Sequence, residues 1–183
     1  TYSSDWYGDD EKMDGGWSLE RIDCNNHSWQ ADNWQASMDE SGGTPGRENS
    51  ISGINPDVIS PRLLAYDLIN SNTIDLFFSE YLELSQALML ENFSLDQGMG
   101  HPDSVVELEN EKFALRLNFP QDFEHNIQYQ LLFSDQLVDL AGNSIEENGF
   151  EFLIADLPQV GDLVINEVLF NPYPGGADYI ELL

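Results

Sequence analysis

The clearest pattern in this chain is an alternation of apolar and polar residues in its second half. Between residues 113 and 119, and again between 127 and 133, an apolar side chain stands at every second position, and residues 150–154 repeat the pattern. This period of two is typical of β-strands that bury one face. The mainly apolar runs 63–69 and 73–78 are separated by Asn70-Ser71-Asn72, which is a turn signal. We therefore predict β-strands along this whole region.

The spacing of these strands predicts their architecture. Between residues 56 and 156 there are about seven short strands, roughly 8–12 residues apart, which is typical of a two-sheet sandwich. The stretch 82–90 is the one candidate for a short helix. We predict an all-β, immunoglobulin-like antiparallel β-sandwich. Six residues are expected in its core: Phe78, Leu115, Leu117, Tyr129, Leu131 and Phe152.

The two ends of the chain have a different character. Residues 1–51 are rich in Gly, Asn, Ser and Asp, contain all four tryptophans, and show strand-like runs at 17–22 and 33–37. Near the other end, residues 163–169 and 178–183 read as two strands, and the chain stops within the second one. We expect a piece of a longer protein, divided into three parts: 1–51, 56–156 and 160–183.

Charge narrows the range of partners. There are 34 Asp and Glu residues against 6 Lys and Arg, which gives a formal net charge of −28. Nucleic-acid binding is excluded because it needs clustered basic residues, and anionic membranes are disfavoured for the same reason. Apolar runs of roughly five residues are also too short to span a bilayer. The single cysteine, Cys24, excludes an internal disulfide framework.

The end segments resemble parts of one known family, the bacterial lamin-tail domain, which is an immunoglobulin-like module. Residues 1–51 resemble its C-terminal half and 160–183 its first strands. The matching motifs are Gly15–Arg21, Asn33–Ser37 and Gly43–Ser50 in the first segment, and Val164–Val168, Asn171-Pro172 and Asp178–Leu182 in the second.

The central segment resembles the bacterial Ig-like domain. The resemblance rests on Ile74–Glu80, on Glu91–Leu95 and on Val138–Asn143, which is similar to the turn before the final strand of that family. Together the two resemblances imply tandem modules of a secreted or surface-exposed protein, of the kind found in Bacteroidota-like bacteria. Neither family has catalytic residues to transfer.

The division of the lamin-tail-like module has a physical consequence. Half a sandwich leaves strand edges unpaired and apolar side chains uncovered, which soluble proteins avoid. We therefore expect 1–51 and 160–183 to pack against each other, within one chain or between copies. The version between copies is favoured, because a sandwich with an odd number of strands places its two ends at opposite poles.

Calcium is the strongest candidate ligand, since Ca²⁺ binds carboxylate, carbonyl and amide oxygens. Two dense acidic loops could supply them, and neither has the spacing of an EF-hand. The simpler alternative is a solvated acidic surface. The candidate metal ligands are Asp9, Asp10 and Asp14 in one loop, and Asp135 and Asp139, with Asn143, in the other.

These observations favour a non-enzymatic spacer or adhesive module at the cell surface or outside the cell. Its partners would be neighbouring modules or other copies, and no cofactor other than calcium is indicated. Two alternatives stay open: an accessory region of a secreted nuclease or protease whose catalytic domain lies elsewhere, and a calcium- or carbohydrate-binding module. The histidines His27, His101 and His125 lie in polar stretches without a nucleophile motif, so we interpret them as surface residues.

Overall fold

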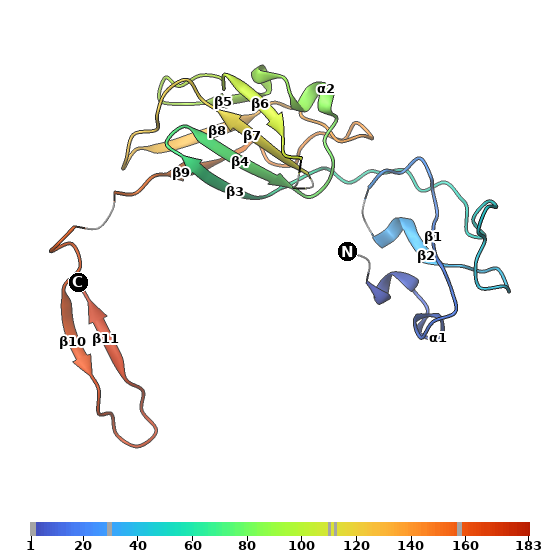
Figure 1. The fold of residues 1–183 in the computed structure, drawn as a ribbon, viewed down its shortest axis with the longest axis horizontal. Helices are drawn as coiled ribbons and strands as arrows, with labels where there is room; N and C mark the ends of the chain where they lie inside the picture. Colours follow the sequence, from blue (N-terminus) through green and yellow to red (C-terminus); the bar gives the residue numbers. More distant parts are fainter. Residues whose placement is uncertain (1–2, 29–30, 110, 112, 157–158) are drawn as a thin grey trace.

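A computed structural model describes residues 3–28, 31–109, 111, 113–156 and 159–183. Its central part is a sandwich of two antiparallel sheets (Figure 1). The described residues of this part form seven strands. They are β3 (Leu63–Asn70), β4 (Thr73–Phe78), β5 (Phe93–Leu95), β6 (Ser104–Glu107), β7 (Ala114–Asn118), β8 (Gln128–Phe133) and β9 (Gly149–Leu153). Between β4 and β5 lie the short helix α2 (Leu84–Ala87) and the 3₁₀ turn η3 (Leu90–Asn92). The helix falls inside the stretch predicted for it.

The strand order confirms the predicted fold class. One sheet has the order β3-β4-β7-β6 and the other β5-β8-β9. This is the ABED and CFG arrangement of a constant-type immunoglobulin sandwich. All pairings within the two sheets are antiparallel.

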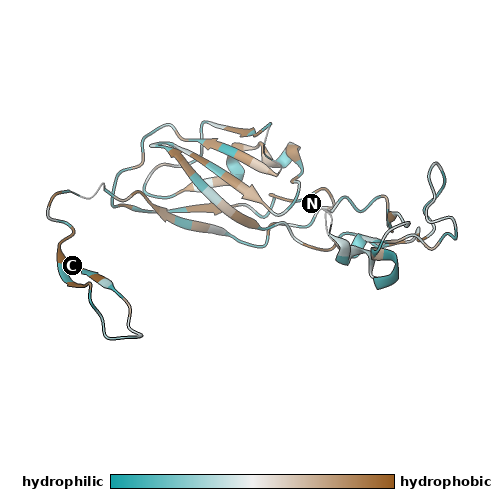
Figure 2. Cartoon of the chain, turned by 60° about the horizontal axis from the view of Figure 1, so that its bottom comes forward, coloured by the Kyte–Doolittle hydropathy of each residue, from teal (hydrophilic) through white to brown (hydrophobic). Residues whose placement is uncertain are grey.

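The core lies between the two sheets and contains the residues that the alternation predicted. All six predicted core residues are at most 4% exposed. Along β8, buried and exposed positions alternate strictly, because successive side chains of a strand point to opposite faces. Figure 2 shows the hydrophobic residues, in brown, and the hydrophilic residues, in teal, along the strands of the sandwich.

The chain enters and leaves the sandwich at opposite poles. At the N-terminal pole, Leu63 of β3 pairs with Phe78 at the end of β4. At the C-terminal pole, the backbone amide of Asn126 donates a hydrogen bond to the carbonyl of Ile154, just after β9. Nearby, the backbone amide of Phe123 donates to the carbonyl of Ser71 in the β3–β4 turn. The segments on either side of the sandwich therefore start from opposite ends of it (Figure 1).

The N-terminal segment contains little regular structure. Its strands are shorter than the predicted runs, and its buried residues are mainly polar, with Glu20, Asn33 and Ser37 at most 4% exposed. Side-chain hydrogen bonds hold such a segment together where aliphatic residues are scarce. Its elements are η1 (Ser4–Tyr7), α1 (Asp10–Met13), β1 (Leu19–Arg21), η2 (Ala31–Asn33) and β2 (Trp34–Ala36), with β1 and β2 antiparallel.

The C-terminal segment is an antiparallel hairpin of β10 (Ile165–Leu169) and β11 (Tyr179–Leu182). Every residue of both strands is exposed. Figure 1 shows the hairpin and the N-terminal segment on opposite sides of the sandwich, so the described residues of the two segments do not form, within one chain, the pairing expected between them. The positions of the two poles explain this separation. Pairing between copies stays a prediction.

A candidate cation site

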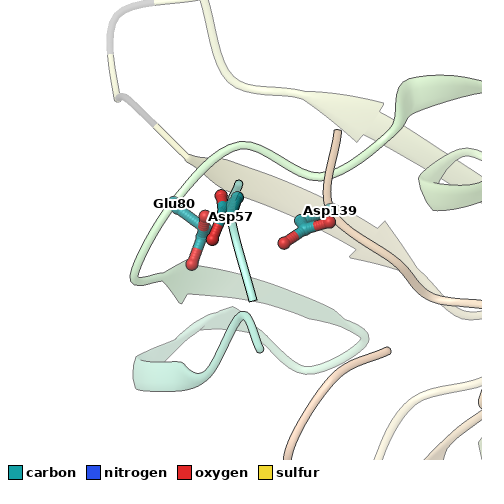
Figure 3. A group of neighbouring side chains, drawn as sticks. All are labelled: Asp57, Glu80 and Asp139. Carbon is teal, nitrogen blue, oxygen red and sulfur yellow. The ribbon is translucent and has the colours of Figure 1, made fainter. Parts of the chain in front are cut away.

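Three carboxylates meet at the N-terminal pole of the sandwich. Asp57 lies in the linker, which we define as residues 52–61, Glu80 follows β4, and Asp139 lies between β8 and β9. One carboxylate oxygen from each residue lies within 4.8 Å of the other two. Figure 3 shows the three side chains gathered from these three separate parts of the chain.

Asp139 is held in place by the turn that follows it. Its Oδ1 accepts hydrogen bonds of 2.8 Å from the backbone amides of Ala141 and Asn143, and its Oδ2 accepts one of 2.8 Å from Asn143 Nδ2. A carboxylate has about four acceptor positions, so these three bonds leave room for another ligand. The turn therefore fixes a buried carboxylate at the pole.

Asp57 is half-buried where the linker reaches the sandwich. Its carbonyl accepts a 3.3 Å hydrogen bond from Asn143 Nδ2, and its Oδ1 accepts one of 3.1 Å from the amide of Ile59. Further along, the carbonyl of Pro61 accepts from the amide of Glu146 at 2.9 Å. The second half of the linker is thus attached to the sandwich.

Glu80 is the least satisfied of the three residues. It is 4% exposed, and its Oε1 is buried without a hydrogen-bond partner. Burial, followed by the negative charges of Asp57 and Asp139, raises the pKa of Glu80 to about 7. The pKa of Asp57 is also raised, by burial first and then by Asp139 and Asp32. Both shifts arise because negative charge is concentrated where water is scarce.

No basic side chain neutralises this group in the part of the chain that the structure describes. The ion pairs formed there involve other acids, and the nearby Arg62 pairs with Glu146 at 3.7 Å. Three carboxylates this close can share a proton or hold a cation. Their oxygens suit hard ions such as Ca²⁺, Mg²⁺ or Mn²⁺.

The structure brings only one of the five predicted metal ligands, Asp139, into this group. Asp9 instead caps α1, because its Oδ1 accepts from the amides of Glu11 and Lys12 at 3.0 and 3.3 Å. Asp10, Asp14 and Asp135 are exposed. Among the residues described, none of these four joins a cluster of three or more potential ligands.

Sequence reasoning missed Asp57 and Glu80 as ligands. Glu80 carried a usable signal, since a charged residue two positions after the end of the mainly apolar strand 73–78 lies at the rim of the core. Asp57 carried none, because it stands in an irregular stretch far along the chain from both partners.

Other candidate chemistry lies on the surface. His27, His101 and His125 are exposed, as expected, and His125 pairs with Asp156 at 2.9 Å. The single thiol, that of Cys24, is also exposed.

The tryptophans of the N-terminal segment show a mixed environment. Trp17 and Trp34 are half-buried, with Lys12 and Arg21 lying 4.5 and 4.9 Å from the centres of their rings. Trp29 lies outside the described residues.

Comparison with known proteins gives matches to solved structures alone. No family model and no curated protein matches the chain. Three structures of the S-layer protein SbsC, each 21% identical, match 60% of this chain. They are the N-terminal part of the bacterial protein (TM-score 0.46), residues 31–844 (0.45) and domains 1–6 (0.46). The matches cover 26%, 15% and 16% of those chains, respectively.

The helices of the described residues are all short. None of them has both the length and the apolar character needed to cross a membrane.

Proposed function

We propose that this chain is a non-enzymatic structural segment of a large bacterial protein that is secreted or displayed at the cell surface. In this role the sandwich keeps neighbouring modules apart. The observation that carries the proposal is the passage of the chain from one pole of the sandwich to the other, between Leu63 and Ile154. Modules joined in this way form an extended string.

The interior of the sandwich supports this role. It is filled by its own side chains, including stacked and edge-to-face aromatic pairs such as Tyr129 with Phe152 and Phe93 with Phe133. A cavity beside Phe78 and Leu115 measures ≈ 10 Å³, which is about the volume that one water molecule needs. A well-filled core of this kind provides stiffness.

The two end segments extend the proposal to the neighbouring modules. We assign 1–51 and 160–183 to lamin-tail-like modules and 56–156 to a bacterial Ig-like domain, as in surface proteins of Bacteroidota-like bacteria. The uncovered hairpin is the feature that favours this assignment, since Val168 and Ile180 are directly paired across its strands and remain 46% and 63% exposed. A neighbouring module or a second copy would cover them.

Small-angle X-ray scattering tests the extended shape. A compact protein of 183 residues has a radius of gyration of about 16 Å. We expect a clearly larger radius of gyration after a concentration series is extrapolated to infinite dilution. A value near that of a compact protein would show the three parts folded together and would overturn the proposal.

Replacement within the parent protein tests the role itself. An unrelated seven-stranded sandwich with its ends at opposite poles should preserve the display of the flanking modules on intact cells, as measured by antibody labelling. If display or activity is lost despite the matched length, surface residues of this chain act directly, as in a binding module or an enzyme accessory region.

A further inference from the structure

We propose that Asp57, Glu80 and Asp139 form a Ca²⁺ site that fastens the linker to the N-terminal pole of the sandwich. The binding of the ion does not depend on the spacer role proposed above. The consequence for the junction between modules rests on that role.

The unpartnered oxygen of Glu80 favours a cation at this site. A buried carboxylate oxygen without a hydrogen bond costs free energy, and nearly all buried polar atoms in proteins have a partner. Glu80 Oε1 lacks one, and its side chain lies with those of Asp57 and Asp139 (Figure 3). A cation among the three carboxylates would supply the missing partner and offset their mutual repulsion.

The chemistry of the three ligands favours Ca²⁺. The group contains oxygen donors and no His or Cys, which disfavours Zn²⁺ and other ions that prefer nitrogen or sulfur. Ca²⁺ accepts irregular sets of about six to eight oxygens, whereas Mg²⁺ requires a near-ideal octahedron. Three carboxylates from separate loops, completed by water, match the tolerance of Ca²⁺ better.

The site lies at the junction between the N-terminal segment and the sandwich. Asn55 is bonded to the N-terminal segment: its amide donates to Asp23 Oδ2 at 3.0 Å, and its carbonyl accepts from Asn26 Nδ2 at 2.9 Å. Asp57 comes two residues later and reaches the sandwich. An ion at Asp57 would therefore hold the linker to the sandwich close to the point where the linker leaves the N-terminal segment.

The test is isothermal titration of the metal-free 183-residue chain with CaCl₂, together with thermal melting in CaCl₂ and in chelator. We expect saturable binding and a melting temperature that rises with the logarithm of the calcium concentration above Kd. Glu80→Gln and Asp57→Asn should each weaken binding at least about tenfold, because loss of even an outer-shell partner of a metal ligand typically weakens metal affinity about 10–100-fold. Glu124→Gln is the matched control, because Glu124 is exposed beside Phe123 at the C-terminal pole; it should bind like the wild type.

Several results would overturn the proposal. These are no binding at millimolar calcium, equal affinity in Glu80→Gln and wild type, equal stabilisation by NaCl of the same ionic strength, or equal binding of MgCl₂. The scattering experiment and this titration measure different properties, so the spacer role and the calcium site can fail separately.

The stability of Glu80→Gln in chelator provides an independent check. Because Gln removes one of three neighbouring negative charges at nearly the same volume, the metal-free variant should melt at or above the wild-type temperature. A lower melting temperature would mean that the Glu80 carboxylate already has a stabilising partner in the metal-free chain, which would contradict the proposal. Far-UV circular dichroism confirms that each variant is folded.

Discussion

Arg116 forms a two-pronged ion pair with Asp75 on the adjacent strand. Its Nε lies 2.6 Å from Asp75 Oδ1 and a terminal nitrogen lies 2.7 Å from Oδ2. The two residues are direct partners in the β4–β7 register. Asp75 is buried, whereas the Arg116 side chain remains 36% exposed, so the arginine covers the carboxylate on the outer face of the four-stranded sheet.

This geometry predicts that Arg116→Gln lowers the melting temperature of the sandwich by several degrees. The variant leaves the buried Asp75 carboxylate without its counter-charge, which costs more than an exposed ion pair contributes. The double variant Asp75→Thr with Arg116→Thr should recover part of the loss, since no uncompensated charge remains. Thermal melts followed by far-UV circular dichroism measure both. If the single variant melts like the wild type, the pair does not stabilise the sheet.

The buried Glu20 predicts acid sensitivity of the N-terminal segment. Burial would raise the pKa of Glu20, but hydrogen bonds outweigh it and lower the pKa from 4.5 to about 2. Oε1 accepts from Thr44 Oγ1 at 2.6 Å, and Oε2 accepts from the amide and hydroxyl of Ser50 at 2.7 and 2.8 Å. Because the folded pKa is depressed, this stabilisation is complete above about pH 4.5 and is lost as the pH falls toward 2.

Tryptophan fluorescence isolates this effect, because all four tryptophans lie within residues 1–51. We expect Glu20→Gln to reduce the free energy of unfolding of this segment by about 1–3 kcal/mol at pH 7. Its stability should also depend less on pH between 4.5 and 2. Glu40→Gln changes an exposed carboxylate and should leave both properties unchanged. If the segment with Glu20→Gln is as sensitive to acid as the wild type, other carboxylates cause that sensitivity.

Gly149 is required where β9 begins. Its φ is +141°, and a Cβ added there would lie 2.1 Å from the carbonyl oxygen of Leu131 and 2.9 Å from Cα of Leu132. Because these are backbone atoms of the paired strand β8, they cannot move aside cheaply. We expect Gly149→Ala to destabilise the sandwich by about 1–3 kcal/mol from overpacking alone.

Gly98→Ala is the control for backbone strain. Gly98 also has positive φ, at +80°, but no heavy atom lies within 4 Å of the added Cβ. Urea denaturation should therefore show a smaller loss for Gly98→Ala than for Gly149→Ala. Equal losses would show that the backbone conformation, and not the contact with β8, sets the cost.

The hairpin predicts association between copies. If its apolar residues cover the N-terminal segment of another chain, sedimentation velocity should show larger species as the concentration increases. Val168→Glu combined with Ile180→Glu should shift this equilibrium toward monomer, since the substitutions place charge at a directly opposed pair. Tyr173→Ser changes an exposed residue of the hairpin loop and is the control. A chain that remains monomeric at millimolar concentration would contradict pairing between copies.

The sequence by itself determined the sandwich. The period-two alternation predicted the buried face of β8, and the turn residues Asn70-Ser71-Asn72 marked the reversal between β3 and β4. These features were readable because each depends on residues close together in the chain. Strand alternation is a local property, and the hydrophobic effect then selects which face is buried.

Only the tertiary structure revealed which three carboxylates come together. Asp139 could be recognised within an acidic turn, but its partners Asp57 and Glu80 come from a linker and from the end of another strand. Their proximity follows from strand order, which places the start of β3, the end of β4 and the turn after β8 at one pole. With 34 acidic residues in the chain, composition could not single out these three. Burial, which removes water from around Glu80, distinguishes this group from the acidic surface.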